Sequence, residues 1–157
     1  MTRLHERLRT DLPIEATFDV IADFENAQLW DPGVAWARRT GPADRPIGVD
    51  TTYELGVRIG SRVAPMSYRI ARYERPTRVV LVGAGSGIDA VDDIRFARSA
   101  GGTAIDYTAD IRLRGLRRLV QPFLGRIFAR IGRDAAAGMA HTLAGLAESD
   151  TDRVGAR

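Results

Sequence analysis

The sequence predicts an α+β domain in which a curved antiparallel sheet of about seven strands wraps around one long C-terminal helix. Three observations lead to this fold class. A short helical stretch lies near the start of the 157-residue chain, and the chain ends in a long apolar stretch with a helical period. Between them runs a series of period-two segments without a helix. Because one helix across a concave sheet leaves a hollow, we expect an interior suited to apolar ligands.

The first elements are a strand and two short helices. Residues 3–12 place leucines on one face and basic residues on the other, as in a half-buried strand. Pro13 fits the start of a helix, and Glu15 in the first turn suits the positive end of the helix dipole. Residues 27–30 add another helical turn, and the sequence Asp31-Pro32-Gly33 ends it.

The remaining strands follow in order, with a loop at residues 41–48. They are predicted around Val34 and Trp36 and at residues 53–59, 66–75, 79–82, 88–96 and 103–113. In the last of these, apolar residues alternate cleanly with aspartate, threonine and arginine. This spacing is typical of an antiparallel meander.

The period becomes helical between residues 116 and 147, with apolar residues on one broad side and arginines on the other. Because proline is tolerated only near the start of a helix, we expect the main helix to begin close to Pro122. These elements predict one domain at residues 1–148, followed by a polar and frayed tail at residues 149–157.

Composition excludes several classes of site. The chain has no cysteine, which excludes disulfides, thiolate nucleophiles and cysteine-based zinc sites. Its two histidines, His5 and His141, are far apart in the chain, and we expect no metal and no organic cofactor. All 23 basic residues are arginine, which we attribute to a GC-rich genome, and a net charge of +3 does not indicate a nucleic-acid partner. No apolar run has the length of a signal peptide core or a membrane span, so a cytoplasmic protein is expected. The sequence leaves the oligomeric state open.

Several phrases together resemble the START-like, helix-grip (SRPBCC) superfamily, of the polyketide cyclase/dehydrase and lipid transport type. These phrases are LPIEATFDVIADFEN at residues 12–26, LWDPGV at 29–34, DDIRF at 92–96, GTAIDY at 102–107 and LRGL at 113–116. The resemblance implies a seven-stranded sheet that grips the C-terminal helix, with two short helices closing one end. It implies a fold and a cavity rather than a particular chemistry, because one fold serves many functions.

The inward faces of these elements supply the candidate ligand-binding residues. The predicted lining consists of Trp36, Tyr53, Leu55, Met66, Tyr68, Asp92, Ile94, Tyr107, Phe123 and Ile127. The alternative is that these side chains simply fill a core. The tyrosine hydroxyls favour the cavity, because a buried hydroxyl needs a hydrogen-bond partner that a ligand or a water molecule can supply.

Asp92 is the most informative single residue, because strand parity places its carboxylate on the apolar face with Ala90 and Ile94. Glu6 takes a similar position on the first strand. A buried carboxylate is expensive and has a raised pKa, which suits a polar anchor or a general base in an apolar pocket. The structural alternatives are an ion pair with an arginine such as Arg72, or a bulge that turns Asp92 outward and its neighbour inward.

His141 is the second candidate catalytic residue. It lies near the edge of the apolar face of the last helix, where a histidine can also be a packing residue. No serine has an evident histidine and aspartate partner, so nothing supports a hydrolase triad.

Two sets of glycines each have two interpretations. The sequence VVLVGAGSG at residues 79–87 lacks the spacing of a dinucleotide-binding loop, so residues 83–87 are predicted to form a hairpin turn or a mobile lip of the cavity. Gly138 and Gly145 are predicted on the sheet-facing side of the last helix. They leave room for a ligand there, or they let the helix pack closely against the sheet.

Arginines gather around the start of the last helix, namely Arg112, Arg114, Arg117, Arg118, Arg126, Arg130 and Arg133. They form a solvated helix face, or a surface for transient docking to an anionic membrane or an acidic carrier protein.

The leading functional hypothesis is that the chain binds a hydrophobic small molecule, such as a lipid, polyketide or aromatic compound, in an internal cavity for carriage or transfer. The alternative is a cyclase or dehydratase-like enzyme that moves protons through Asp92, a tyrosine hydroxyl or His141. A third is a protein-interaction module with a vestigial cavity.

Overall fold

The computed structural model describes residues 1–42, 44–115 and 125–155. It contains one seven-stranded antiparallel sheet with strand order β1-β7-β6-β5-β4-β3-β2. The strands are β1 (Thr2–Thr10), β2 (Val34–Thr40), β3 (Thr52–Ile59), β4 (Arg62–Glu74), β5 (Arg78–Gly85), β6 (Ile88–Ser99) and β7 (Gly102–Leu113). The helices are α1 (Ile14–Ala22), the 3-10 helix η1 (Phe24–Asn26), α2 (Ala27–Trp30) and α3 (Gly125–Gly155). This arrangement confirms the predicted α+β helix-grip fold class.

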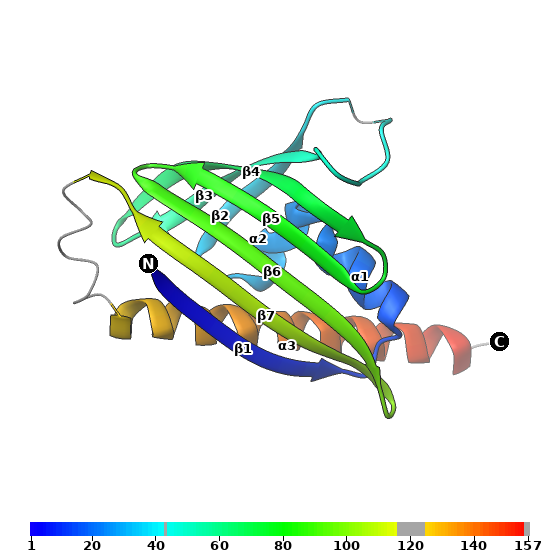
Figure 1. Ribbon diagram of the computed structural model, residues 1–157. Helices are drawn as coiled ribbons and strands as arrows, with labels where there is room; N and C mark the ends of the chain where they lie inside the picture. Colours follow the sequence, from blue (N-terminus) through cyan, green and yellow to red (C-terminus); the bar gives the residue numbers. More distant parts are fainter. Residues whose placement is uncertain (43, 116–124, 156–157) are drawn as a thin grey trace.

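The sheet has one face covered by helices, called here the inner face, and one outer face. In Figure 1 the outer face is toward the viewer, and α1 and α2 lie behind the sheet. The helix α3 runs along β1 and also contacts α2. The first strand, β1, forms one edge of the sheet and pairs with the last strand, β7. The helix α3 packs mainly against this edge strand.

The first strand and helix form as the sequence predicts. On β1, basic residues alternate with half-buried leucines, and Arg3 and Arg7 form ion pairs with Asp110 and Asp106 of β7 on the outer face. Pro13 precedes α1, and its carbonyl accepts hydrogen bonds from both the backbone N–H and the hydroxyl of Thr17. The first helix is thus fixed at its N-terminus next to β1.

The glycine-rich segment is mostly strand. The predicted short strand at residues 79–82 extends over β5 to Gly85, so Gly83 belongs to the sheet. The turn itself is Ser86-Gly87, whose φ angles of 52° and 76° match a two-residue hairpin of the type I′ kind. The hairpin prediction is confirmed, and its bounds are narrower than expected.

The core joins the inner face of the sheet to α1, η1, α2 and the middle of α3. Phe24 lies at its centre, with ring centroids 5.9 Å from Trp30, 6.3 Å from Tyr53 and 5.1 Å from Tyr68. The buried residues of α3 in the core are Ala135, Met139 and Leu143. Each large apolar side chain buried in this way contributes about 1.5–3 kcal/mol to folding.

Trp36 corrects one prediction, because it does not face the interior. A bulge between Val34 and Trp36 shifts the alternation of β2 by one residue, so that Ala37 rather than Trp36 pairs with the inward Leu55. Trp36 instead lies on the outer face, 39% exposed, over Gly56 and with the Arg38 guanidinium 5.8 Å from its ring.

Ile127 corrects a second prediction, because it is 56% exposed on α3. Residues four apart on a helix drift by about 40° per step, so Ile127 lies about 120° around the axis from the buried Met139. The predicted start near Pro122 lies outside the described residues. At the other end, α3 continues to Gly155, so residues 149–155 of the predicted frayed tail are helical.

The two glycines of α3 differ from each other and from the prediction. Gly138 lies against the end of α2 rather than the sheet, because a Cβ added there would be 2.0 Å from the carbonyl oxygen of Trp30. Gly145 is exposed and has open space around the corresponding position. Neither position therefore acts as predicted, and close packing against the sheet occurs instead at Gly132, next to Leu4.

Candidate functional site

Asp92 faces inward, and its carboxylate is the centre of the candidate site. The strand β6 pairs with both neighbours in continuous register through Asp92 and Asp93, so no bulge turns Asp92 outward. Its exposed fraction is 4%. Asp93 takes the outer face and pairs with Arg78 at 2.8 Å, while Arg72 pairs with Glu74 at 2.8 Å. Asp92 therefore forms no ion pair with Arg72 or with any other arginine in the described ranges, and no bulge turns it outward.

Tyr107 is the hydrogen-bond partner of Asp92. It lies on the adjacent strand β7, directly opposite Ile94, and its hydroxyl donates to Asp92 Oδ1 at 2.7 Å. Asp92 Oδ2 is buried and has no hydrogen-bond partner among the described residues. One carboxylate oxygen is thus held in place, and the other is left to accept a further hydrogen bond.

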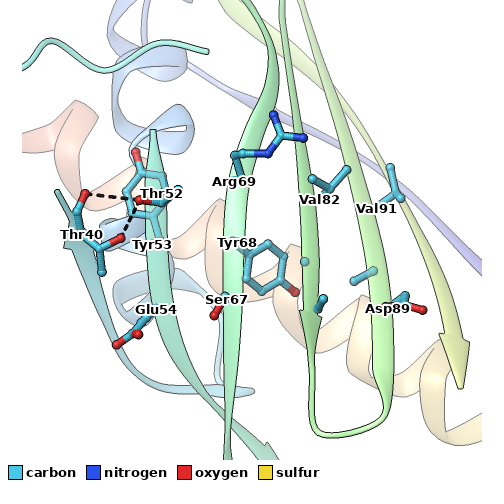
Figure 2. Close-up of a pocket in the computed structure, with 13 residues that line it drawn as sticks. Thr40, Thr52, Tyr53, Glu54, Ser67, Tyr68, Arg69, Val82, Asp89 and Val91 are labelled. Atoms are coloured by element: carbon cyan, nitrogen blue, oxygen red, sulfur yellow. Dashed lines mark hydrogen bonds between the residues drawn. The ribbon is translucent and has the colours of Figure 1, made fainter. Parts of the chain in front are cut away.

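Tyr68 approaches the same place from β4 because its neighbour on β5 is a glycine. Tyr68 and Gly83 are paired in register, and a Cβ at Gly83 would be 2.5 Å from the ring carbons of Tyr68. Figure 2 shows the ring lying from β4 toward β5. Gly83 is paired in turn with Ala90 on β6, so small residues let the tyrosine ring lie flat toward Asp92.

The electrostatics of this cluster follow from burial. Burial raises the pKa of Asp92 to about 7, partly offset by the hydrogen bond from Tyr107, while the charge of Asp31 raises it further. Burial also raises the pKa values of Tyr68 and Tyr107 well above the usual range, and the Asp92 charge adds to both. Near neutral pH the carboxyl group therefore titrates, while both hydroxyls stay protonated.

Asp31 is a member of this cluster that sequence reasoning missed. It ends α2, accepts a hydrogen bond from the backbone N–H of Gly33 at 2.7 Å, and has its pKa raised by burial. Its charge acts on Asp92, Tyr68 and Tyr107. The sequence Asp31-Pro32-Gly33 looks like a helix stop, and only the folded position of α2 brings the carboxylate toward the sheet.

Another buried polar atom of the interior, the indole nitrogen of Trp30, also lacks a hydrogen-bond partner among the described residues. The hydroxyl of Tyr53 lies close to the Asp23 side chain and the Phe24 backbone. Burial and the nearby charge of Asp23 raise the pKa of Tyr53. An unsatisfied buried polar group costs about 1–3 kcal/mol, so Asp92 Oδ2 and the Trp30 indole nitrogen are two costly features of this core.

The other predicted site residues fall into two groups. Tyr53, Leu55, Met66, Tyr68, Ile94 and Tyr107 are all buried on the inner face, where parity placed them. His141 is exposed on α3 and does not join the Asp92 cluster. Phe123 lies outside the described residues.

A hollow of about 660 Å³ lies on the other side of the sheet. Its walls are mainly the outward-facing side chains of β3 to β6, among them Glu54, Arg69, Val82 and Val91 (Figure 2). Tyr53 and Tyr68 border it from within the sheet, and no described helix residue contributes to it. This outer hollow differs from the internal cavity that the sequence predicts.

The described residues contain neither a candidate metal cluster nor a helix that could span a membrane. These residues form no group of three or more side chains that could hold a metal ion. None of the described helices combines the length and apolarity that crossing a membrane requires.

Two arginines of the predicted basic surface, Arg126 and Arg130, are exposed at the start of α3, and the Arg130 guanidinium lies 3.7 Å from the Asp134 carboxylate.

Comparison with solved structures places the fold among known ones. The chain resembles TTHA0849 from Thermus thermophilus with a TM-score of 0.75 and 12% identity, covering 94% of this chain and 99% of that one. It resembles the Zhui aromatase/cyclase from Streptomyces sp. R1128 with a TM-score of 0.72 and 11% identity, covering 93% of each chain. A START superfamily protein from Mycobacterium smegmatis gives a TM-score of 0.72 at 12% identity, with coverage of 95% and 99%. At these identities the likeness concerns the fold alone.

Comparison of the sequence itself with curated proteins finds no match. A family model described as polyketide cyclase/dehydrase and lipid transport matches residues 1–144. Because this match covers most of the chain and agrees with the fold, the chain belongs to the polyketide cyclase/dehydrase and lipid transport family.

Proposed function

We propose that this chain binds a hydrophobic small molecule, such as a lipid, polyketide or aromatic compound, between the inner face of its sheet and the helices, for carriage or transfer. The observation that carries the proposal is the Asp92 carboxylate, which is 4% exposed on the mainly apolar inner face. Tyr107 satisfies one of its oxygens, and the other has no partner among the described residues. Cores that serve only for packing leave few such groups, so this one is assigned to a ligand.

Family membership supports the proposal, because the family description includes lipid transport. The aromatic rings of Phe24, Tyr53 and Tyr68 add support. They form a connected group on the inner side, with centroid separations of 6.3 and 5.1 Å from Phe24. Such rings offer a ligand large apolar surfaces and edge-to-face contacts.

Purified protein is expected to carry or to take up an apolar molecule. Native mass spectrometry of protein from its expression host should show a noncovalent adduct that disappears on denaturation. Protein stripped of such adducts should bind a naphthalene-type fluorophore saturably, with one site per chain. Absence of both an adduct and saturable binding would leave only the interaction module with a vestigial cavity.

One observation favours the second candidate function, an enzyme of the cyclase or dehydratase kind. Asp92 has a pKa of about 7 and is hydrogen-bonded to Tyr107, which suits a general acid or base near neutral pH. His141 is exposed and is not part of this mechanism. Catalysis would consist of orienting a flexible β-keto chain and moving a proton between its carbon or oxygen atoms and Asp92.

For this second function, Asp92→Asn is expected to abolish turnover of a β-keto chain, because asparagine cannot exchange a proton at this pH. Affinity for an apolar probe without polar groups, such as naphthalene, should remain within a few-fold. Steady-state turnover and equilibrium binding measured on the same preparation separate the two effects. Turnover that persists in Asp92→Asn would remove Asp92 from the chemistry and leave binding as the function.

A further inference from the structure

We propose, resting on the function proposed above, that the ligand donates a hydrogen bond from a hydroxyl group to Asp92 and that apolar acids are rejected. The ligand class is therefore an apolar, hydroxyl-bearing molecule, such as a phenol, rather than a fatty acid or an aromatic carboxylate. The chemistry of the buried groups around Asp92 leads to this choice.

The first reason is the hydrogen-bonding capacity of Asp92. Its Oδ1 accepts the hydroxyl of Tyr107 at 2.7 Å, and its buried Oδ2 has no partner among the described residues. In its ionised form Asp92 only accepts hydrogen bonds, so the group that completes the site in that form is a donor. A ligand hydroxyl can donate this hydrogen bond without bringing a charge into the site and without transferring its proton to Asp92.

The second reason is the sign of the charge on the inner face. In the described part of the chain, no basic side chain forms an ion pair with Asp92. Two nearby arginines are used elsewhere, since Arg78 on β5 and Arg95 on β6 both pair with Asp93 on the outer face. An ionised ligand carboxylate would therefore meet no counter-charge beside Asp92.

Among the described residues, the groups whose charges or hydroxyls act on Asp92 are neutral or acidic. Tyr107 on β7 and Tyr68 on β4 are neutral hydroxyls, and Asp31 at the end of α2 adds a second carboxylate. Glu6 on β1 is half-buried and lies in register opposite Tyr107. Like charges brought together in a desolvated site repel each other strongly, and this repulsion is the basis for rejecting acids.

The third reason is space next to the carboxylate. Ala109 lies directly opposite Asp92 on β7, and Ala90 precedes it on the same face of β6. Gly83 on β5 is paired with Ala90 and carries only the Tyr68 ring. Leu81 lies opposite Asp92 on β5, and Ile94 follows it on the inner face of β6, so the small residues lie only on the β7 side and toward the hairpin. The proposed ligand ring lies over Ala90 and Ala109, with its hydroxyl at Oδ2.

The test compares three probes that share one ring system, namely 2-naphthol, naphthalene and 2-naphthoate, titrated into the stripped protein at pH 8. At this pH Asp92 is mostly ionised, because its pKa is about 7. We expect 2-naphthol to bind about tenfold more tightly than naphthalene, as one hydrogen bond to a charged acceptor provides. We expect 2-naphthoate to bind at least about tenfold more weakly than naphthalene.

Two matched variants locate the effect. In Asp92→Asn the ratio of 2-naphthol to 2-naphthoate affinity should fall at least about tenfold, because the amide supplies a donor and carries no charge. Asp93→Asn makes the same chemical change one residue along β6, on the outer face, and should leave the ratio unchanged. Equal binding of the naphthol and the naphthoate by the wild-type protein, or equal ratios in both variants, would overturn the inference while leaving apolar ligand binding intact. Failure of all three probes to bind would instead overturn the proposed function, and this inference with it.

Discussion

Replacing Gly138 by alanine is expected to destabilise the fold by about 2 kcal/mol, whereas the same replacement at Gly145 is expected to stabilise it by up to about 1 kcal/mol. Alanine normally stabilises a helix relative to glycine by about 1 kcal/mol, so a similar gain would be expected at both positions if only the helix mattered. The difference arises from what each new methyl group meets.

At Gly138 the new Cβ would be 2.0 Å from the carbonyl oxygen of Trp30 and 3.3 Å from Cδ of Pro32. The first of these atoms belongs to the backbone and cannot rotate away. A hydrogen bond one turn further along also joins α3 to α2, because the hydroxyl of Thr142 donates to the carbonyl of Leu29 at 3.1 Å. The methyl group therefore forces α3 away from α2, and the cost of overpacking exceeds the gain in helix propensity.

Chemical denaturation of the wild-type protein and the two variants measures the effect. The transition midpoint should move to lower denaturant concentration for Gly138→Ala and to higher concentration for Gly145→Ala, with unchanged slopes. Equal shifts in the same direction would mean that α3 does not pack against α2 at Gly138.

Much of the fold could be predicted from the sequence because its strands alternate so regularly. On β7, Ile105 and Tyr107 face inward while Asp106 faces outward, and each residue takes the face that its parity assigns. Pro13 and the Asp31-Pro32-Gly33 sequence mark element boundaries through backbone restrictions that act locally. Such signals need no knowledge of distant partners.

The two wrongly predicted side-chain orientations, those of Trp36 and Ile127, occur where the alternation of a strand or the repeat of a helix shifts relative to the core. The bulge in β2 moves Trp36 to the outer face, and nothing in the local sequence distinguishes this strand from a regular one. Ile127 belongs to a four-residue repeat that drifts around α3, so its exposure depends on how the helix is rotated over β1. Both are consequences of tertiary packing.

The candidate site was predicted in part. Parity alone identified Asp92 and Tyr107 as inward-facing, because both lie in strands without a bulge. Their mutual hydrogen bond depends on the register between β6 and β7, and the approach of Asp31 depends on where α2 lies over the sheet. Both contacts join segments that are far apart in the sequence, so local sequence patterns do not predict them.

Replacing Asp92 by asparagine is expected to increase stability above neutral pH by several kcal/mol. The pKa of Asp92 in the folded protein is about 7, compared with an ordinary value of 3.8, so the folded state binds the proton more tightly than the unfolded state does. Between these two values the free energy of unfolding falls as pH rises, by at most about 4 kcal/mol in total. Asparagine does not ionise, and it keeps an oxygen to accept the hydroxyl of Tyr107.

The expected gain for Asp92→Asn is therefore about 2–4 kcal/mol at pH 8 and close to zero at pH 4. Thermal or urea denaturation across this pH range provides the measurement, on protein stripped of ligand so that binding does not contribute.

Asp93→Asn is the matched control with the opposite sign. Hydrogen bonds from Arg78 lower the pKa of Asp93, so this carboxylate stabilises the folded state above its ordinary pKa and loses that effect as pH falls. The variant should be less stable than the wild-type protein at pH 8, with a difference that shrinks in acid. If Asp92→Asn and Asp93→Asn both destabilised the protein at pH 8, the Asp92 carboxylate would have to be compensated in the folded state, and it could not serve as the open acceptor on which both proposals depend.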